Sequence, residues 1–290
     1  MAYGGKNWGN FISVNGLESG RFLDAPEFVV MHDKGNEANV FDRADYQFDQ
    51  ADSMHVNFQY TRSWFQTPNS YDTQFGFVNS GLTAGDQDQR SKIETVLVAP
   101  TYTRILNPHA VFNFAPYLRR DSYNYYPSNN LRNDLGPIQQ ESVGQYRTLT
   151  NVGVHSDVSY TIGPNNLKFG GQYSQTFLRE NDTIGVVDPN LNAPGSATFN
   201  PVLLPYDLTR GGTTYTWRGR TDVKQTALYG EDSLTAGKWL FNFGIRGDIY
   251  NGLAIQRQGE PRAGVSYNLK KTGTVPVSYT HLTLPTIYSV

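Results

Sequence analysis

Long segments of this chain alternate apolar and polar residues one by one, and this pattern restricts the fold more than any other feature. In segment 239–249 every odd-numbered residue is aromatic, isoleucine or glycine, whereas the even-numbered residues include Asn242, Arg246 and Asp248. A period of two residues predicts a β-strand whose two faces meet different surroundings. The same alternation occurs in segments 56–64, 151–162 and 167–177.

Further segments of high β propensity bring the expected number of strands to about eleven. They cover residues 9–16, 20–29, 37–48, 91–105, 108–119, 222–234 and 260–270. Many of these strands are longer than the ~5–6 residues usual in globular proteins. At ~3.3 Å per residue and a tilt near ~40°, about ten residues cross an apolar layer of ~25 Å. The strand lengths therefore favour an all-β protein that crosses a membrane.

The links between these strands alternate between short and long. Short links rich in Gly, Pro, Asn and Asp lie at 49–53, 106–108, 163–166 and 235–238. Long links lie at 66–90, 120–145 and 179–221, and the shorter link 250–259 falls on their side. Tight turns at one rim and long loops at the other are typical of an antiparallel up-and-down transmembrane β-barrel.

Composition agrees with this architecture and excludes several classes of function. Charged residues make up 17% of the 290 residues, against ~25% in a typical soluble domain, while aromatic residues reach 13%. The net charge of −2 offers no basic surface for nucleic acid. The absence of cysteine excludes disulfides and thiolate metal sites. The mean hydropathy of −0.51 does not argue against a barrel, because such a protein shows its lipid face only in every second residue.

Segment 223–252 resembles the barrel hairpin of TonB-dependent outer-membrane receptors. That hairpin has an aromatic strand ending in Glu-Asp, a short turn, and a strand with Gly-x-Arg-x-Asp. Segment 260–267, Glu-Pro-Arg-Ala-Gly-Val-Ser-Tyr, is similar to the next strand of the family. Segments 33–48 and 64–72 resemble the Oar-like branch, whose members often carry a carboxypeptidase-regulatory-like domain. The residues that match the hairpin are Tyr229, Glu231, Asp232, Gly244, Arg246 and Asp248.

The resemblance implies a receptor in the bacterial cell outer membrane that imports a scarce nutrient, such as a siderophore, a vitamin or an oligosaccharide. The implied partners are the lipid bilayer and lipopolysaccharide, the small-molecule nutrient, a plug domain, and TonB, which delivers the energy. A complete barrel of this kind has 22 strands. We therefore expect residues 1–276 to form about half of a 22-stranded barrel. Residues 1–8 lack the features of a signal peptide, so an exported form is expected to begin upstream.

The last segment, 277–290, departs from the pattern of the family. It resembles a recurrent tail found at the ends of metagenomic genes, which arises when sequencing adapter is translated. We expect these residues not to be genuine protein. Finding the tail in the genomic DNA would refute this expectation.

No motif in the sequence indicates catalysis or metal binding. Gly-x-Ser-x-Gly, His-Glu-x-x-His and P-loop patterns are absent. Segment 86–89 has alternating oxygen ligands but lacks the glycine and the distal glutamate of a calcium loop. We expect no enzyme activity, no catalytic residue, no metal and no cofactor. The histidines are scattered without ligand spacing, at His32, His55, His109, His155 and His281.

Arg246 and Asp248 share one strand face, which is the lumen face if the aromatic face contacts lipid. His155 and Asp157 share the polar face of another strand in the same way. These four residues are candidates for a charge-paired lumen lining. The alternative, implied by the resemblance, is that they contact a plug domain and help to gate transport.

Aromatic residues and arginines gather near the bases of two expected long loops. Such residues dominate binding hot spots, because they offer stacking area and forked hydrogen-bond donors. They are candidates for ligand binding. The alternative places the aromatics in an interfacial girdle and pairs the arginines with lipopolysaccharide phosphates. The candidates are Arg119, Arg120, Tyr123, Tyr125, Tyr126, Tyr215, Trp217, Arg218 and Arg220.

Two other classes of protein remain as alternatives. A small porin or adhesin barrel would act passively and would close its last strand onto residues 9–16. A secreted β-rich carbohydrate-binding or hydrolytic protein would need paired carboxylates in a cleft and a charged outer face.

Overall fold

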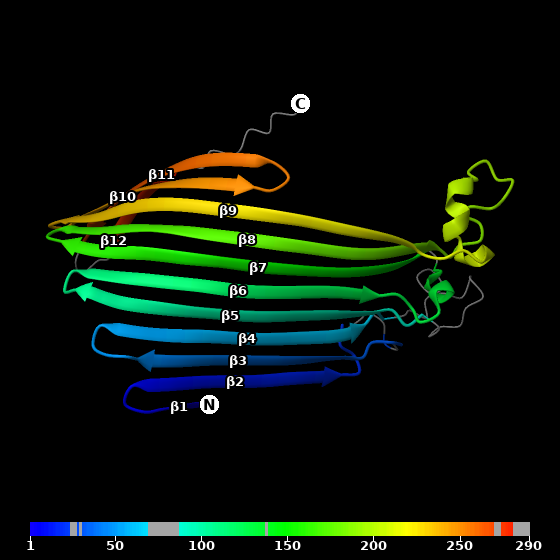
Figure 1. Ribbon diagram of the computed structural model, residues 1–290, viewed down its shortest axis with the longest axis horizontal. Coiled ribbons are helices and arrows are strands. Elements are labelled where there is room, and N and C mark those ends of the chain that lie inside the picture. The colour runs from blue at the N-terminus through cyan, green and yellow to red at the C-terminus, as the bar shows by residue number, and fades with distance from the viewer. Residues whose placement is uncertain (24–27, 29–30, 69–86, 137–138, 270–273, 281–290) are drawn as a thin grey trace.

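The protein is an open, curved, all-β sheet in a computed structural model (Figure 1). The structure describes the chain except residues 24–27, 29–30, 69–86, 137–138, 270–273 and 281–290. In this described part of the chain, twelve antiparallel strands follow one another in the sheet in sequence order. They are β1 (Ala2–Gly4), β2 (Trp8–Ser19), β3 (Gly35–Gln47), β4 (Asp52–Gln66), β5 (Arg90–Asn107), β6 (Ala110–Tyr126), β7 (Glu141–Ile162), β8 (Asn165–Val186), β9 (Tyr215–Ala236), β10 (Trp239–Asn251), β11 (Ile255–Asn268) and β12 (Thr274–Thr280).

Tight turns join the strands at one end of the sheet and long loops join most of them at the other (Figure 1). The turns β7–β8 and β9–β10 each contain a glycine with positive φ, Gly163 at 55° and Gly237 at 62°. Residues with a side chain rarely adopt this backbone conformation, so glycine permits these two-residue turns. The loops β6–β7 and β8–β9 hold the short 3-10 helices η2 (Leu131–Asp134), η3 (Pro201–Tyr206) and η4 (Leu208–Arg210). The predicted alternation of turns and loops is confirmed.

The strand register sorts the side chains onto two faces. Arg246 of β10 pairs with Tyr229 of β9, which pairs with Gly170 of β8, so these residues point to one side, the polar face. The opposite side, the apolar face, carries Phe243 and Ile245, which are 52% and 66% exposed. Within the described residues no second sheet covers the apolar face. This exposure argues against a sandwich-type carbohydrate-binding protein, in which such rows would be buried between sheets.

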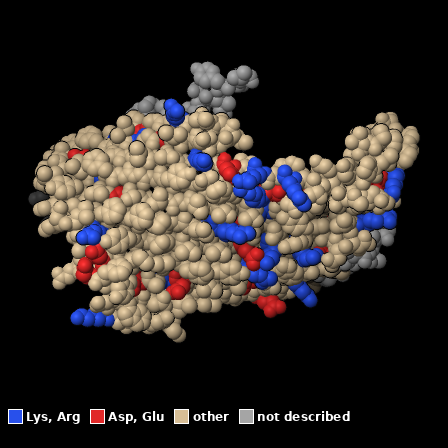
Figure 2. Space-filling model, in the orientation of Figure 1, with Lys and Arg blue, Asp and Glu red and all other residues tan. Residues whose placement is uncertain are grey.

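The apolar face has a belt of uniform width. On β4, β5 and β6 four successive outward residues are apolar or aromatic before the first charge, which is Arg62, Glu94 or Arg120. Four outward residues alternate with four inward ones, so the belt spans about eight residues, or ~20 Å on a tilted strand. Lys and Arg gather about midway along the strands, and a mostly uncharged surface lies between them and the tight-turn end (Figure 2). The belt on these three strands consists of Met54, Val56, Phe58, Tyr60, Val96, Val98, Pro100, Tyr102, Phe112, Phe114, Pro116 and Leu118.

Segment 20–29 was expected to be a strand, and this prediction is wrong. Its described residues form bends that link β2 to β3. The ring of Phe22 stacks on Phe65 at 5.6 Å, and the backbone N–H of Phe22 donates to the carbonyl of Asp33. Its aromatic ring therefore packs against the end of β4 and not into a strand of its own. Instead, β1 and β12 complete the sheet.

The end of the chain contributes to the sheet. Residues 277–280 pair with β11 as part of β12. The remainder of the expected tail, 281–290, lies outside the described residues, as do His281 and residues 69–86 of the expected link 66–90. None of the described helices is long and apolar enough to cross a membrane.

Candidate functional site

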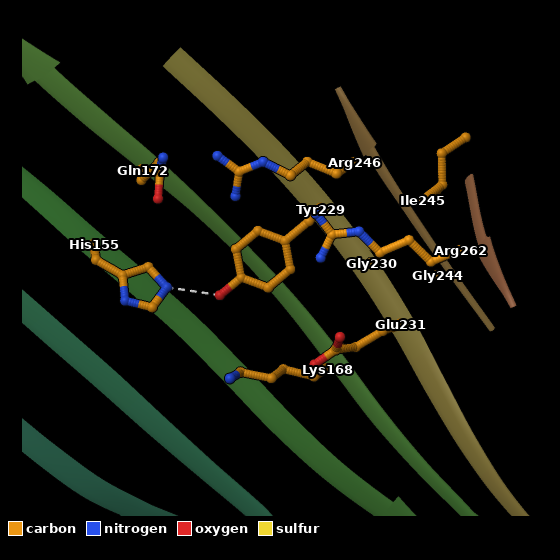
Figure 3. A pocket seen from close by; sticks show the side chains of 10 residues that line it. All are labelled: His155, Lys168, Gln172, Tyr229, Gly230, Glu231, Gly244, Ile245, Arg246 and Arg262. Carbon is orange, nitrogen blue, oxygen red and sulfur yellow. Dashed lines mark hydrogen bonds between the residues drawn. The ribbon is translucent and has the colours of Figure 1, made fainter. Parts of the chain in front are cut away.

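Five strands, β7 to β11, place a grid of polar side chains on the polar face (Figure 3). Because register partners face the same side, the grid can be read from the pairings. One row is His155, Gln172, Ala227, Asp248 and Gln258; the next is Asp157, Gly170, Tyr229, Arg246 and Glu260; the third is Ser159, Lys168, Glu231, Gly244 and Arg262. Eight of these residues border an open cavity of about 310 Å³: His155, Lys168, Gln172, Tyr229, Glu231, Gly244, Arg246 and Arg262.

Tyr229 connects two strands that are not neighbours. Its ring lies over Gly170 of β8, and its hydroxyl is 2.6 Å from Nε2 of His155 on β7 (Figure 3). A Cβ atom at Gly170 would lie 2.5 Å from this hydroxyl. Glycine at this position is therefore what lets the tyrosine cross β8 and reach the histidine.

The cations of the grid are neutralised mainly by acids on their own strands. Arg246 donates to both carboxylate oxygens of Asp248, at 2.8 and 3.1 Å, and Arg262 is 3.0 Å from Glu260. Lys168 lies 4.0 Å from a carboxylate oxygen of Asp157. The predicted pairing of Arg246 with Asp248 is thus present in the structure.

Pairing of an arginine with an acid two residues away on the same strand recurs elsewhere on the polar face. Arg43 and Asp45 of β3 approach to 2.8 Å, as do Arg119 and Asp121 of β6. Each pair lies two residues apart on one strand, so neither residue depends on a neighbouring strand for its partner. An exposed face lined in this way carries many charges with little net charge.

The loop candidates lie on strands, and their assignment to loops is wrong. Arg119 to Tyr126 belong to β6, and Tyr215 to Arg220 belong to β9. Both strands continue beyond the apolar belt, where polar residues occupy both faces. The loops themselves are only 127–140 and 187–214.

The register divides these candidates between the two faces. Arg119, Tyr123, Tyr125, Tyr215 and Trp217 lie on the polar face, together with His155 and Arg246. The others, Arg120, Tyr126, Arg218 and Arg220, lie on the apolar face. The structure therefore brings only the first group toward a common space.

Sequence reasoning did not predict the contacts of several polar-face residues in the same region. Arg147 of β7 is 3.1 Å from Glu180 of β8, and Tyr117 of β6 donates a hydrogen bond to Asn151. Lys168 and Gln172 border the cavity. Their positions in the alternating segment 167–177 indicated the face but not the neighbours, which depend on the register.

Hydrogen bonds connect the described loops into one assembly at the long-loop end. Asp88 accepts a hydrogen bond from the backbone N–H of Asn129, and Gln140 donates to Asp188 at 2.7 Å. Asp134, which has no exposed surface, accepts hydrogen bonds from Ser128 and Ser142. These links join residues 87–89 to loop 127–140, and that loop to the start of loop 187–214.

Asp207 organises loop 187–214. Burial tends to raise the pKa of this carboxyl, but hydrogen bonds from Thr209 and Arg210 outweigh burial and hold the pKa below its ordinary value. The side chain of Asn192 completes the loop by bonding the backbone of Asn200 in both directions. In the described part of the chain no group of metal-binding side chains has assembled.

Several solved outer-membrane proteins share this fold at low sequence identity. The chain aligns with the ferric citrate transporter FecA over 94% of its own length and 38% of that chain, with 14% identity and a TM-score of 0.61. The sheet therefore has the fold of part of the barrels of these transporters. The ferric catecholate import receptor Fiu of E. coli K12 matches 96% of this chain and 50% of that one, with 14% identity and a TM-score of 0.58.

A third neighbour is BauA, the ferric preacinetobactin receptor of Acinetobacter baumannii, with 8% identity, a TM-score of 0.61 and coverage of 94% and 42%. The chain thus spans between 38% and 50% of the length of these three proteins. They are receptors and transporters, not enzymes. No family model and no curated protein matches the sequence.

Proposed function

We propose that this chain is the barrel portion, residues 1–276, of an outer-membrane receptor that imports a scarce nutrient with energy delivered through TonB. The observation that carries the proposal is the pairing of an exposed apolar belt with a charged, cavity-bearing opposite face, in a sheet with the fold of receptor barrels. In this arrangement the apolar face contacts acyl chains and the polar face lines a watery lumen.

The membrane placement follows from the width of the belt. A belt of ~20 Å is close to the ~25 Å apolar band of outer-membrane barrels. The strands β7 and β8, of 22 residues each, extend well beyond such a layer at their long-loop end. This end would face the cell exterior, where long loops lie in such barrels.

We assign nutrient binding to the polar-face residues that lie between the level of the belt and the long-loop end of the strands. Tyr123, Tyr125 and Trp217 offer aromatic surface on this face, and Arg119, paired with Asp121, adds a guanidinium group farther along β6. Siderophores, vitamins and oligosaccharides are all candidates. Because FecA, Fiu and BauA are named for ferric ligands, a chelated ferric ion is the first nutrient to test.

The part of the polar face at the level of the belt, which includes His155, Asp157, Arg246 and Asp248, would then face a plug domain in the longer parent protein. Self-neutralised pairs suit this role, because a plug can be displaced without leaving unpaired charges behind. The resemblance of segments 33–48 and 64–72 supports an Oar-like receptor as the parent.

Uptake by cells that express the natural gene tests the proposal. We expect uptake of radioiron-labelled ferric citrate or a ferric catecholate, of cobalamin or of a maltooligosaccharide, and we expect an uncoupler of the proton-motive force to abolish it. The Trp217→Ala variant should reduce the same uptake. Uptake that persists with the uncoupler would indicate a passive porin, and recovery of the protein outside the outer-membrane fraction would reject both.

A further inference from the structure

Two register rows on the polar face, between the belt and the long-loop end, bring acids next to an aromatic ring. Asp182 of β8 is the register partner of Trp217 of β9, and Glu180 pairs with Gly219 in the next row. The ring of Trp217 extends over Gly219, where it leaves no room for a Cβ atom. Since alternate residues and register partners share a face, both acidic side chains leave the neighbouring strand on the same side as the ring. Trp217 is 45% exposed, so a ligand can reach its ring.

One arginine lies near both acids. Arg147 of β7 has its Nε atom 3.1 Å from a carboxylate oxygen of Glu180 and its Nη2 atom 4.0 Å from an oxygen of Asp182. The other oxygen of Asp182, Oδ1, is buried and has no hydrogen-bond partner among the described residues. Two carboxylates and one guanidinium thus leave a net charge of −1. Because a buried carboxylate without full pairing is costly, Asp182 would gain from a closer cation than Arg147.

The two faces of β8 and β9 carry opposite charge at this level. Arg179 of β8 and both Arg218 and Arg220 of β9 lie on the apolar face. On the polar face of β7, β8 and β9, all of whose residues the structure describes, Arg147 is the only cation between the belt and the long-loop end. A ligand on the polar face therefore meets acids and an aromatic ring, while the arginines of these strands lie behind the sheet.

We infer that Trp217, Glu180 and Asp182 form a site that binds a cationic group of the nutrient, such as a protonated amine. The inference rests on the proposed function and narrows the nutrient to one that carries such a group. A cation is attracted to the face of a tryptophan ring, and an ammonium group donates strong hydrogen bonds to carboxylates. An anionic group would instead be repelled by the same two acids.

The experiment compares two ferric hydroxamates that differ in a single charge. Ferrioxamine B carries a free ammonium group beside its chelated iron, and N-acetylation of this amine makes the complex neutral. Binding of both forms to the full chain in uncharged detergent is measured with radioiron. We expect wild type to bind ferrioxamine B about tenfold more tightly than the acetylated form, because only the ammonium group can contact both the ring and a carboxylate. Tetramethylammonium should compete with ferrioxamine B, and sodium at the same ionic strength should not.

Three variants identify the residues that cause the preference. Asp182→Asn keeps the shape of the side chain and should reduce the preference to about twofold, which an exposed ring provides by itself. Trp217→Leu should weaken binding of ferrioxamine B more than binding of the acetylated form. The matched control is Asp222→Asn, which makes the same change on the apolar face of β9 and should keep the full preference.

Four results would each overturn the inference. They are equal affinity of wild type for the two forms, an unchanged preference in Asp182→Asn, an equal loss in Asp222→Asn, and no binding of ferrioxamine B at millimolar concentration. Uptake by cells is not part of this measurement. Absence of energy-dependent uptake, together with an intact charge preference, would reject import through TonB and leave the cation site standing.

Discussion

The hydroxyl of Tyr229 lies 2.6 Å from Nε2 of His155, although a whole strand separates their backbones. The contact crosses Gly170, where the missing side chain leaves room for the tyrosine ring. It fixes the position of two polar-face side chains that border the cavity.

Gly170→Val should break this contact. Its Cβ would meet the Tyr229 hydroxyl at 2.5 Å and the Ser156 carbonyl oxygen at 2.8 Å, and the second atom belongs to the backbone and cannot move aside. Overpacking of this kind costs about 1–3 kcal/mol. Urea unfolding of the protein in detergent measures the loss. Gly247→Ala is the control, since nothing lies within 4 Å of its Cβ; equal effects of the two would contradict the assigned role of Gly170.

Adjacent residues of β5 test the two faces. Val98→Arg places a charge in the middle of the apolar belt and should cost about 2–4 kcal/mol, because a cation there contacts acyl chains. Leu97→Arg places the same charge on the polar face and should cost far less. The stability of both variants in lipid bilayers checks this difference. A sheet buried against a second layer on its apolar face would instead be insensitive to the presence of lipid.

Loop 187–214 should loosen in acid. The folded pKa of Asp207 lies below the ordinary value of about 3.9, so the unfolded loop binds the proton more readily. The stabilisation is therefore complete above about pH 4 and is lost as the pH falls through the folded pKa. Hydrogen exchange of the loop amides measures the change. Asp207→Asn should show fast exchange already at pH 7, and slow exchange in that variant would refute the role of the carboxylate.

Nutrient uptake should depend on the face that a residue occupies. Trp217→Ala on the polar face should weaken nutrient binding by about 2 kcal/mol or more, as loss of an aromatic hot spot does. Arg218→Ala, one residue along the same strand, points to the apolar face and should leave nutrient binding unchanged. Titration of the two variants with the transported nutrient makes the comparison. Equal losses would remove the distinction between the faces.

The apolar belt made most of the fold predictable, and its absence explains the errors. Segment 239–249 was predicted almost to its ends because one face is apolar throughout, and β10 is Trp239–Asn251. Between the belt and the long-loop end both faces of the strands are polar, so the two-residue period disappears. For this reason the long-loop ends of β6 and β9 were assigned to loops. Segment 20–29 contains apolar residues without such a period, and it is not a strand in its described residues.

The candidate site was predictable only in part for a related reason. Alternation placed Arg246 and Asp248 on the same face, and their pairing followed from that position alone. The contact between His155 and Tyr229 joins residues 74 positions apart in sequence and depends on the register of three strands. No local pattern encodes that register.

The hydrogen bonds between the loops at the long-loop end limit how far one loop can change without the others. Gln140 donates a hydrogen bond to Asp188, and Asp88 accepts one from Asn129. The conformation of each loop therefore depends in part on residues of another loop. A new recognition specificity could not arise by exchanging one loop in isolation. Descendants of this protein should therefore vary these loops together, and grafts that transplant a single loop should lose order in its neighbours.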